Sequence, residues 1–226
     1  MTFLLDTIVC PPFGENTYLV GDAASGEAVV IDPGGRIDEI VRTAELRGVR
    51  ITQIWGTHSH IDHMAGVAEL QRRTGAPFLL HPEAVPMLVG LPVQAERFGM
   101  PPVAVPTVQR LLAAGDSVSA GQYTFTVRDT PGHAPGHVTF VGRDVEYEGV
   151  TADVAFCGDV IFHGSIGRTD LPGGDYALLL GSIEAQILTL DDRTVLFNGH
   201  GPATTVGRER RSNPFVLDWL AHHVAR

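Results

Sequence analysis

Residues 57–63 read THSHIDH and place three imidazoles and one carboxylate between His58 and His63. With ten His in 226 residues, an HxHxDH string arises by chance in about one such chain in a thousand. The structural alternative is a solvated polar loop, because so much polar surface is costly to bury in a core. Neutral imidazole and carboxylate ligands suit zinc, iron or manganese, so this stretch predicts a metal site.

The spacing within this stretch favours more than one ion. His58 and His60 point the same way if the chain is extended, whereas a turn into the next helix brings Asp62 and His63 round to another side. A site for two ions needs further ligands from distant segments. The sequence offers three, each after an apolar run and beside a glycine, where a rigid sheet presents a loop: His133 in TPGHAPGH (130–137), Asp159 in CGD (157–159) and His200 in NGHG (198–201).

The pattern around these motifs alternates short strands with helices, which indicates the α/β class. Apolar, partly β-branched runs predict strands at 3–9, 17–20, 28–31, 51–56, 123–127, 138–141, 154–156 and 194–197. Apolar residues at helical spacing predict helices at 37–47, 64–73, 175–190 (with Asp175 as N-cap) and 214–224. No repeat or composition shift divides the chain, so we expect one domain over 1–226 with a short C-terminal helix at 213–226.

Residues 82–106 break this pattern, since they hold six of the fifteen prolines. Proline fixes φ and removes a backbone donor, so we expect regular structure to be interrupted there. Two interpretations stay open for this insertion. It is either a surface segment between core elements or a loop over the active site.

Composition excludes several classes of function. The formal net charge is −10 and the pI is near 5.4, which leaves no basic footprint for nucleic acid. The first residues lack the basic region of a signal peptide, and no apolar run reaches the length of a membrane span. The two cysteines, Cys10 and Cys157, suit buried free thiols in a reducing compartment. We therefore expect a cytoplasmic protein with no membrane partner.

Taken together, the motifs resemble the metallo-β-lactamase superfamily and, within it, the glyoxalase II-like hydrolases. The resemblance runs from about Phe13 to Pro202, and its marks are THSHIDH (57–63), TPGHAPGH (130–137), CGDVIFHGSIGRTDLPGGD (157–175) and NGHGPATT (198–205). It implies an αββα sandwich of two mixed β-sheets with helices outside and metals at one edge.

The resemblance also implies a ligand set for two divalent ions, with zinc favoured and iron or manganese as alternatives. The first ion takes His58, His60 and His133. Carried over in the same way, the second ion takes Asp62, His63 and His200, and Asp159 bridges both. His137 and His163 are then expected to support the site rather than bind metal, and His81, His222 and His223 to lie on the surface.

The implied reaction is hydrolysis of a small acyl-thiol substrate, a thioester such as S-lactoylglutathione, through a metal-bridging hydroxide. A thiolate leaves without much help from a general acid, because its parent thiol has a pKa of about 8.5. The candidate catalytic residues are Asp62, Asp159 and Arg168. Arg168 either binds a substrate carboxylate or pairs with Asp170 and braces its loop, and the second interpretation is favoured.

Two departures from the glyoxalase II pattern concern glutathione. Residues 203–226 follow His200-Gly201-Pro202, so we expect no counterpart of the helical segment that completes the glutathione pocket in glyoxalase II. Arg168 and Asp170 stand where those enzymes have a Lys and a Tyr. Three alternatives therefore stay open. They are a persulfide dioxygenase with one iron on His58, His133 and Asp159, a lactonase, and a non-catalytic binding module. The oligomeric state cannot be inferred from the sequence.

Overall fold

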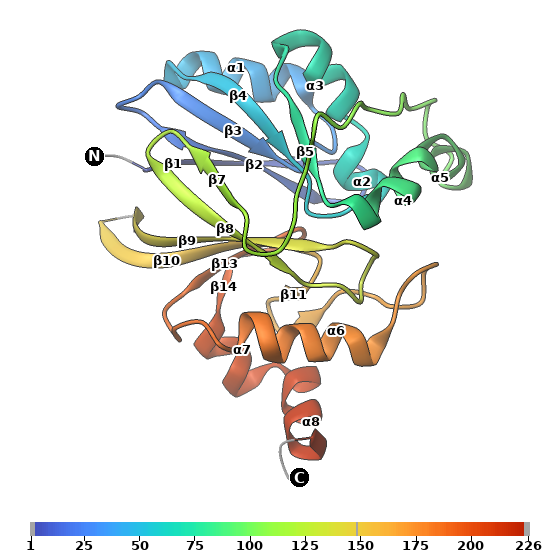
Figure 1. Ribbon diagram of the computed structural model, residues 1–226, viewed down its shortest axis with the longest axis vertical. Coiled ribbons are helices and arrows are strands. Elements are labelled where there is room, and N and C mark those ends of the chain that lie inside the picture. The colour runs from blue at the N-terminus through green and yellow to red at the C-terminus, as the bar shows by residue number, and fades with distance from the viewer. Residues whose placement is uncertain (1–2, 148, 224–226) are drawn as a thin grey trace.

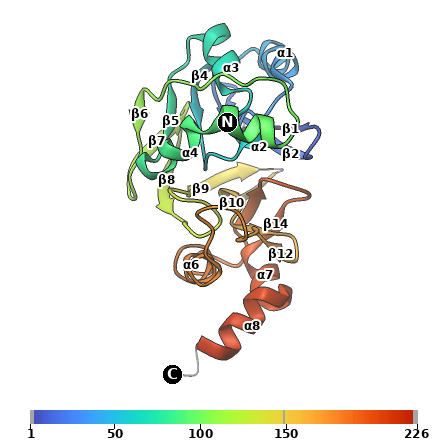
Figure 2. The same cartoon turned by 90° about the vertical axis from the view of Figure 1, so that its right-hand side faces the viewer.

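Two six-stranded β-sheets face each other, and helices cover the outer face of each (Figure 1). This computed structural model describes residues 3–147 and 149–223. Figure 2, turned by 90°, shows the same order of layers, with α1 and α3 on one outer side and α6, α7 and α8 on the other. The arrangement confirms the predicted αββα sandwich.

The first sheet is mixed: its N-terminal strands pair antiparallel, and its later strands pair parallel. Its order follows the chain: β1 (Phe3–Cys10), β2 (Glu15–Asp22), β3 (Glu27–Ile31), β4 (Arg50–Trp55), β5 (Phe78–Leu80) and β6 (Arg110–Leu111). The β3 to β4 crossover carries helix α1 (Ile37–Arg47), which ends where Gly48 adopts a positive φ of 68°.

The second sheet is also mixed, because β10 pairs parallel with β13 and antiparallel with β9. Its order is β14 (Thr204–Thr205), β13 (Val195–Asn198), β10 (Val150–Gly158), β9 (Val138–Tyr147), β8 (Tyr123–Asp129) and β7 (Ser117–Ala120). A short hairpin, β11 (Ile161–Phe162) with β12 (Ser165–Ile166), follows β10.

Helices pack on both outer faces. On the first sheet lie α1, α2 (Ile61–Met64), α3 (Val67–Thr74), the 3₁₀ turn η1 (Pro82–Ala84), α4 (Val85–Val89) and α5 (Leu91–Arg97). On the second lie α6 (Tyr176–Ser182), the π-helical turn η2 (Ile183–Ile187), α7 (Val206–Ser212) and α8 (Pro214–His223). Within residues 3–147 and 149–223, no helix is both long and apolar enough to cross a bilayer.

Three apolar clusters match these layers. The central one joins the inner faces of both sheets, where Trp55 of β4 packs on Phe125 and Phe140 with ring centroids 5.5 and 5.0 Å apart. The other two lie beneath the outer helices, around residues such as Met64 and Leu70 on one side and Leu180 and Val216 on the other. Burial of these side chains removes apolar surface from water and holds the sheets in fixed register.

The proline-rich insertion differs from the prediction. Residues 82–97 form η1, α4 and α5 with a turn at Gly90, and residues 98–109 carry no helix or strand. Pro86 and Pro92 each stand in the first turn of a helix, where the missing N–H has no intrahelical acceptor to lose. Prolines therefore begin these helices rather than interrupt them.

The predicted helix at 175–190 is shorter than expected. Asp175 is its N-cap, as predicted, and accepts a hydrogen bond from the backbone N–H of Leu178 at 3.0 Å. The α-helix ends at Ser182 and continues as the π-helical turn η2. The C-terminal helix is present, and its predicted last residues, 224–226, lie outside the described residues.

Candidate metal centre

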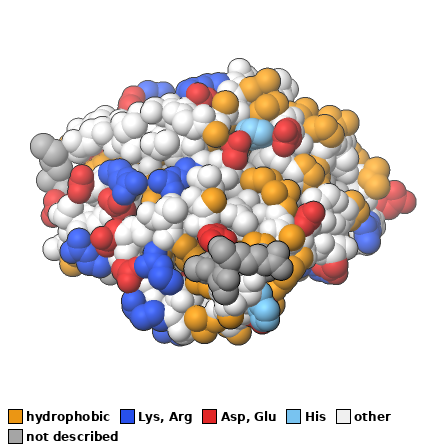
Figure 3. All heavy atoms as spheres, turned by 60° about the horizontal axis from the view of Figure 1, so that its bottom comes forward, with side chains coloured by type: hydrophobic (Ala, Val, Ile, Leu, Met, Phe, Trp, Pro, Cys, Tyr) orange, Lys and Arg blue, Asp and Glu red, His pale blue; other side chains and the backbone are white. Residues whose placement is uncertain are grey.

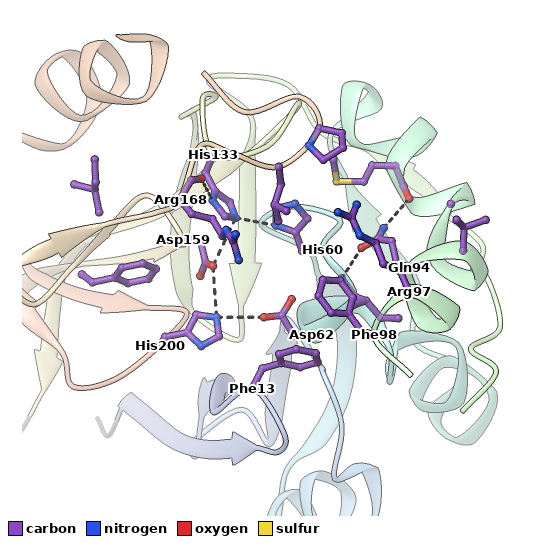
Figure 4. Close-up of a pocket in the computed structure, with 18 of the residues that line it drawn as sticks. Phe13, His60, Asp62, Gln94, Arg97, Phe98, His133, Asp159, Arg168 and His200 are labelled. Carbon is purple, nitrogen blue, oxygen red and sulfur yellow. Dashed lines mark hydrogen bonds and ion pairs between the residues drawn. The ribbon is translucent and has the colours of Figure 1, made fainter. Parts of the chain in front are cut away.

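The predicted ligands meet at one edge of the sandwich, where strands end and loops begin. Residues 58–63 follow β4, His133 follows β8, Asp159 follows β10 and His200 follows β13. The parallel register of β10 and β13 pairs Gly158 with Asn198, so Asp159 and His200 emerge side by side. Figure 4 shows His60, Asp62, His133, Asp159 and His200 converging on a single pocket.

These side chains form two groups of metal-binding geometry. In each group, one ligand atom per residue lies within 4.8 Å of the others. The first group is His58, His60 and His133. The second group is Asp62, His63 and His200. The structure thus brings together every residue that the sequence predicts for the two ions.

Asp159 lies between the two groups. Its Oδ2 is 3.6 Å from His133 Nε2 of the first group and 3.4 Å from His200 Nε2 of the second. Its Oδ1 is 3.3 Å from His63 Nε2. A carboxylate in this position can contribute one oxygen to each of two ions, which is the bridging role predicted for Asp159.

Hydrogen bonds fix which nitrogen three of the histidines offer, those at positions 58, 63 and 133. The Thr57 hydroxyl donates to Asp32 Oδ2 at 2.5 Å, and it can therefore accept a hydrogen bond from His58 Nδ1 at 3.0 Å. His63 Nδ1 lies 3.0 Å from the same Asp32 oxygen, and His133 Nδ1 lies 2.8 Å from the carbonyl oxygen of Arg168. Each of these contacts requires a proton on Nδ1, which leaves the Nε2 lone pair for a metal.

Several buried polar atoms of the centre have no hydrogen-bond partner, and this shows whether the residues are suited to binding a metal. His58 is fully buried, and its Nε2 has no hydrogen-bond partner. His63 Nε2 and Asp159 Oδ1 also make no hydrogen bond and lie 3.3 Å from each other as an ion pair in the centre. Because a buried polar atom without a partner is costly, these atoms fit a centre in which metal ions are their partners.

The histidines of the centre fall into two sets, those whose pKa is lowered and those whose pKa is raised. Burial holds the pKa of His58 well below its usual value, and burial also lowers the pKa of His133. Burial opposes charge on His63 and His200 too, but the carboxylates Asp159 and Asp62 outweigh it and raise both pKa values, that of His200 to about 10. Without metal the second group therefore holds protons that an ion must displace.

Gly199 lies so close to the ligands Asp159 and His63 that a side chain has no room there. A Cβ added at Gly199 would lie 2.0 Å from Asp159 Oδ1 and 2.7 Å from the His63 ring. This explains the glycine before His200 in the NGHG motif. Any larger residue would push the Asp159 carboxylate out of place.

The pocket beside the centre has a volume of about 750 Å³, which is in the range of small-molecule sites. It is lined largely by apolar side chains. They include Phe13 from the loop after β1, Met87 and Val93 from α4 and α5, and Leu171 from the loop after β12. Residues of the proline-rich insertion form one wall, as the second interpretation of that segment predicts.

Arg168 lines this pocket but is engaged with its neighbour. Its Nε and Nη2 donate to the two carboxylate oxygens of Asp170, both at 2.7 Å. This is the bracing contact that the sequence favoured. The Arg168 carbonyl oxygen orients His133, so the loop also serves the centre through its backbone.

Sequence reasoning did not single out Asp32 and Thr57, which orient the ligands. Asp32 also receives the backbone N–H of Thr57 at 2.7 Å, and its own φ is 49°. A non-glycine residue at positive φ is uncommon, but the signal in the sequence was only an Asp-Pro-Gly-Gly turn at a strand end. The prediction for His137 fits: its Nε2 accepts the backbone N–H of Asp159 at 3.2 Å. The surface prediction for His81 is wrong, because His81 is 9% exposed and caps η1.

Comparisons with known proteins agree with this geometry. A profile of the metallo-beta-lactamase superfamily matches residues 10–200. The hydroxyacylglutathione hydrolase GloC of Haemophilus influenzae is 35% identical over 214 residues, which cover 94% of this chain and 97% of that protein.

Two solved structures resemble the whole sandwich. The B3 metallo-beta-lactamase BLEG-1 has a TM-score of 0.82 at 35% identity, covering 94% of this chain and 99% of that chain. TTHA1623, whose crystal structure is a di-iron-bound form, has a TM-score of 0.80 at 36% identity, covering 93% and 99%. On its sequence, its fold and its His/Asp centre, the chain belongs to the metallo-beta-lactamase superfamily of metallohydrolases.

Proposed function

We propose that the protein is a binuclear thioester hydrolase of the glyoxalase II type, acting on a small acyl-thiol such as S-lactoylglutathione. The observation that carries the proposal is the chemistry of the pocket lining. Among the described residues that line it, the only titratable side chains outside the metal centre are Arg97 and Arg168. The described lining thus offers no separate general acid, which suits a leaving group that departs as an anion. A thiolate does so readily.

The centre itself supports a pair of ions. His58, His60 and His133 would hold one, Asp62, His63 and His200 the other, and Asp159 both. When bound, two divalent ions supply Lewis acidity and lower the pKa of water toward neutrality. Zinc is the favoured metal, and the di-iron form of TTHA1623 keeps iron as a candidate.

The chain's own residues have distinct parts in this reaction. Asp32 and Thr57 hold the imidazoles of His63 and His58 in the metal-binding tautomer. The apolar walls of the pocket exclude water from the acyl-thiol, which strengthens electrostatic interactions at the reacting carbonyl. The relative GloC of Haemophilus influenzae is a hydroxyacylglutathione hydrolase by name, and this supports the same substrate class here.

The second ligand group favours this proposal over a persulfide dioxygenase. A single iron on His58, His133 and Asp159 would give Asp62, His63 and His200 no metal. These three residues are nevertheless gathered around Asp159 with His200 Nε2 3.3 Å from Asp62 Oδ2.

The test is hydrolysis of S-lactoylglutathione by the metal-loaded protein, with and without a chelator. We expect chelator-sensitive turnover with kcat/KM of about 10⁴ M⁻¹s⁻¹ or more. The O-lactoyl ester of a matched alcohol is the control for thioester preference. A cephalosporin tests for β-lactam hydrolysis, and a glutathione persulfide in an oxygen electrode tests for dioxygenase activity. A preparation with two ions per chain that hydrolyses no thioester would overturn the proposal, and oxygen uptake with one iron per chain would assign the dioxygenase.

A further inference from the structure

The pocket holds two cationic side chains, and they differ in what they contact. Arg168 forms a bidentate pair with Asp170. Arg97, the last residue of α5, lies on the opposite side of the pocket (Figure 4). Among residues 3–147 and 149–223, the structure gives the exposed Arg97 side chain no hydrogen bond and no ion pair. Its positive charge is therefore available to a ligand.

Helix α5 is anchored to the metal-binding segment, which fixes where Arg97 lies. Gln94 Oε1 accepts the backbone N–H of Ile61 at 3.0 Å, and its Nε2 donates to the carbonyl oxygens of Ser59 and Met87, each at 3.2 Å. Arg97 follows Gln94 by three residues and so lies on the same side of the helix. The anchor ties the position of Arg97 to that of the metal ligands on either side of Ile61.

The surface between Arg97 and the centre is apolar. Phe98 of this wall packs edge to face on Phe13, with ring centroids 5.5 Å apart. Val93 and Phe98, which line the pocket, are also among the exposed large hydrophobic residues. In Figure 3, hydrophobic side chains are more frequent in the right half of the view, and most Lys and Arg side chains lie in the left half.

We infer that Arg97 determines substrate specificity by binding a carboxylate of the thioester at a point remote from the scissile carbonyl. The inference rests on the proposed function and adds the substrate's charge to it. A planar guanidinium matches a carboxylate with two parallel hydrogen bonds. A phosphate fits less well, because it carries nearly two charges and Arg97 is the one cation of the lining that the described residues leave unpaired.

The carboxylate can belong to the thiol part or to the acyl part of the substrate, and two matched pairs of thioesters separate these sources. The first pair is S-lactoylglutathione and its dimethyl ester. The second is S-adipoyl-N-acetylcysteamine and its monomethyl ester. For each pair, the ratio of kcat/KM for acid over ester measures carboxylate recognition.

We expect Arg97→Met to lower this ratio by about tenfold to a hundredfold in one of the two pairs, since a charged hydrogen-bonded pair is lost. Arg97→Lys should fall between wild type and Arg97→Met. Arg42→Met is the matched control, because Arg42 is an exposed arginine of α1 outside the pocket lining, and its ratios should equal those of wild type. Ratios unchanged by Arg97→Met in both pairs would overturn the inference. Lactoyl-coenzyme A is assayed alongside them because its carrier bears phosphates and no carboxylate, and an effect of Arg97→Met seen only with this substrate would also overturn the inference.

A binding measurement separates this inference from the proposed function. Thioether analogues of the two acids, in which a methylene replaces the scissile carbonyl, are titrated calorimetrically into metal-loaded wild type and Arg97→Met. If wild type hydrolyses no thioester but binds one analogue at least tenfold more tightly than Arg97→Met, the reaction is wrong and the role of Arg97 stands. If neither analogue distinguishes the two proteins, the role of Arg97 is wrong whatever the activity.

Discussion

The carboxylate of Asp159 contacts three histidines from both ligand groups, so it is the residue on which a two-ion centre depends most. We expect Asp159→Ala to lose at least one of two ions and thioester hydrolysis together, because neither group then has a shared anion. Metal content by elemental analysis and turnover are the measurements. Asp191→Ala, at an exposed aspartate paired with Arg193, is the control. Full metal content with full activity would place the bridge elsewhere.

Asp32 acts one contact further from the ions, through His63 and Thr57. Asp32→Asn removes the charge that holds both partners but keeps a residue type that tolerates the positive φ at this position. We expect metal affinity to fall about tenfold to a hundredfold with the fold retained. Competition with a chromophoric chelator measures the affinity, and circular dichroism checks the fold. An unchanged affinity would show that the His63 ring is held by packing alone.

At the scale of elements, the side chain of Gln94 joins α5 to the ligand segment by hydrogen bonds. Gln94→Ala removes three hydrogen bonds, and at about 1 kcal/mol or less for each we expect the free energy of unfolding to fall by about 1–3 kcal/mol and Tm by about 3–10 °C. Amide hydrogen exchange in residues 91–97 should speed up. Glu96→Ala on the exposed side of the same helix is the control, and equal exchange rates in the two variants would contradict the anchoring role.

At the scale of the whole molecule, stability should couple pH to metal. The pKa of His200 is raised to about 10 in the metal-free protein, against about 6.5 in an unfolded chain. Protonated His200 therefore stabilises the metal-free fold fully below pH 6.5, and this contribution is lost as pH rises through about 10. His63, whose pKa is also raised, acts in the same direction.

With metal bound, His200 and His63 are neutral ligands across this range, so the same loss should not occur. We expect Tm to decline between pH 6.5 and 10 in the presence of a chelator, and to change much less after metal loading. Tm measured across this range in both states is the test. A metal-free protein whose Tm is flat over this window would show that His200 and His63 are not held charged by Asp62 and Asp159.

The sequence by itself indicated an α/β protein and the motif segments that carry the chemistry, and the resemblance of these motifs to the metallo-β-lactamase superfamily implied the sandwich and the seven candidate ligands. Residues 58–63 form one short segment, and His133, Asp159 and His200 each follow an apolar run beside a glycine. In the structure the strands that precede these residues, β4, β8, β10 and β13, all end at the same edge of the sandwich, and the residues meet there.

Only the tertiary structure decided which residues support the ligands and shape the pocket. Asp32 reaches His63 across 31 positions, and Gln94 reaches Ser59 across 35, through contacts that no local periodicity encodes. The proline-rich insertion was misread for a related reason. A proline interrupts a helix interior but begins a helix equally well, and packing of Leu88, Leu91 and Ala95 on the first sheet decides which occurs. Arg97 acquires its position in the same way, because it borders the centre only where α5 packs against the loop after β4.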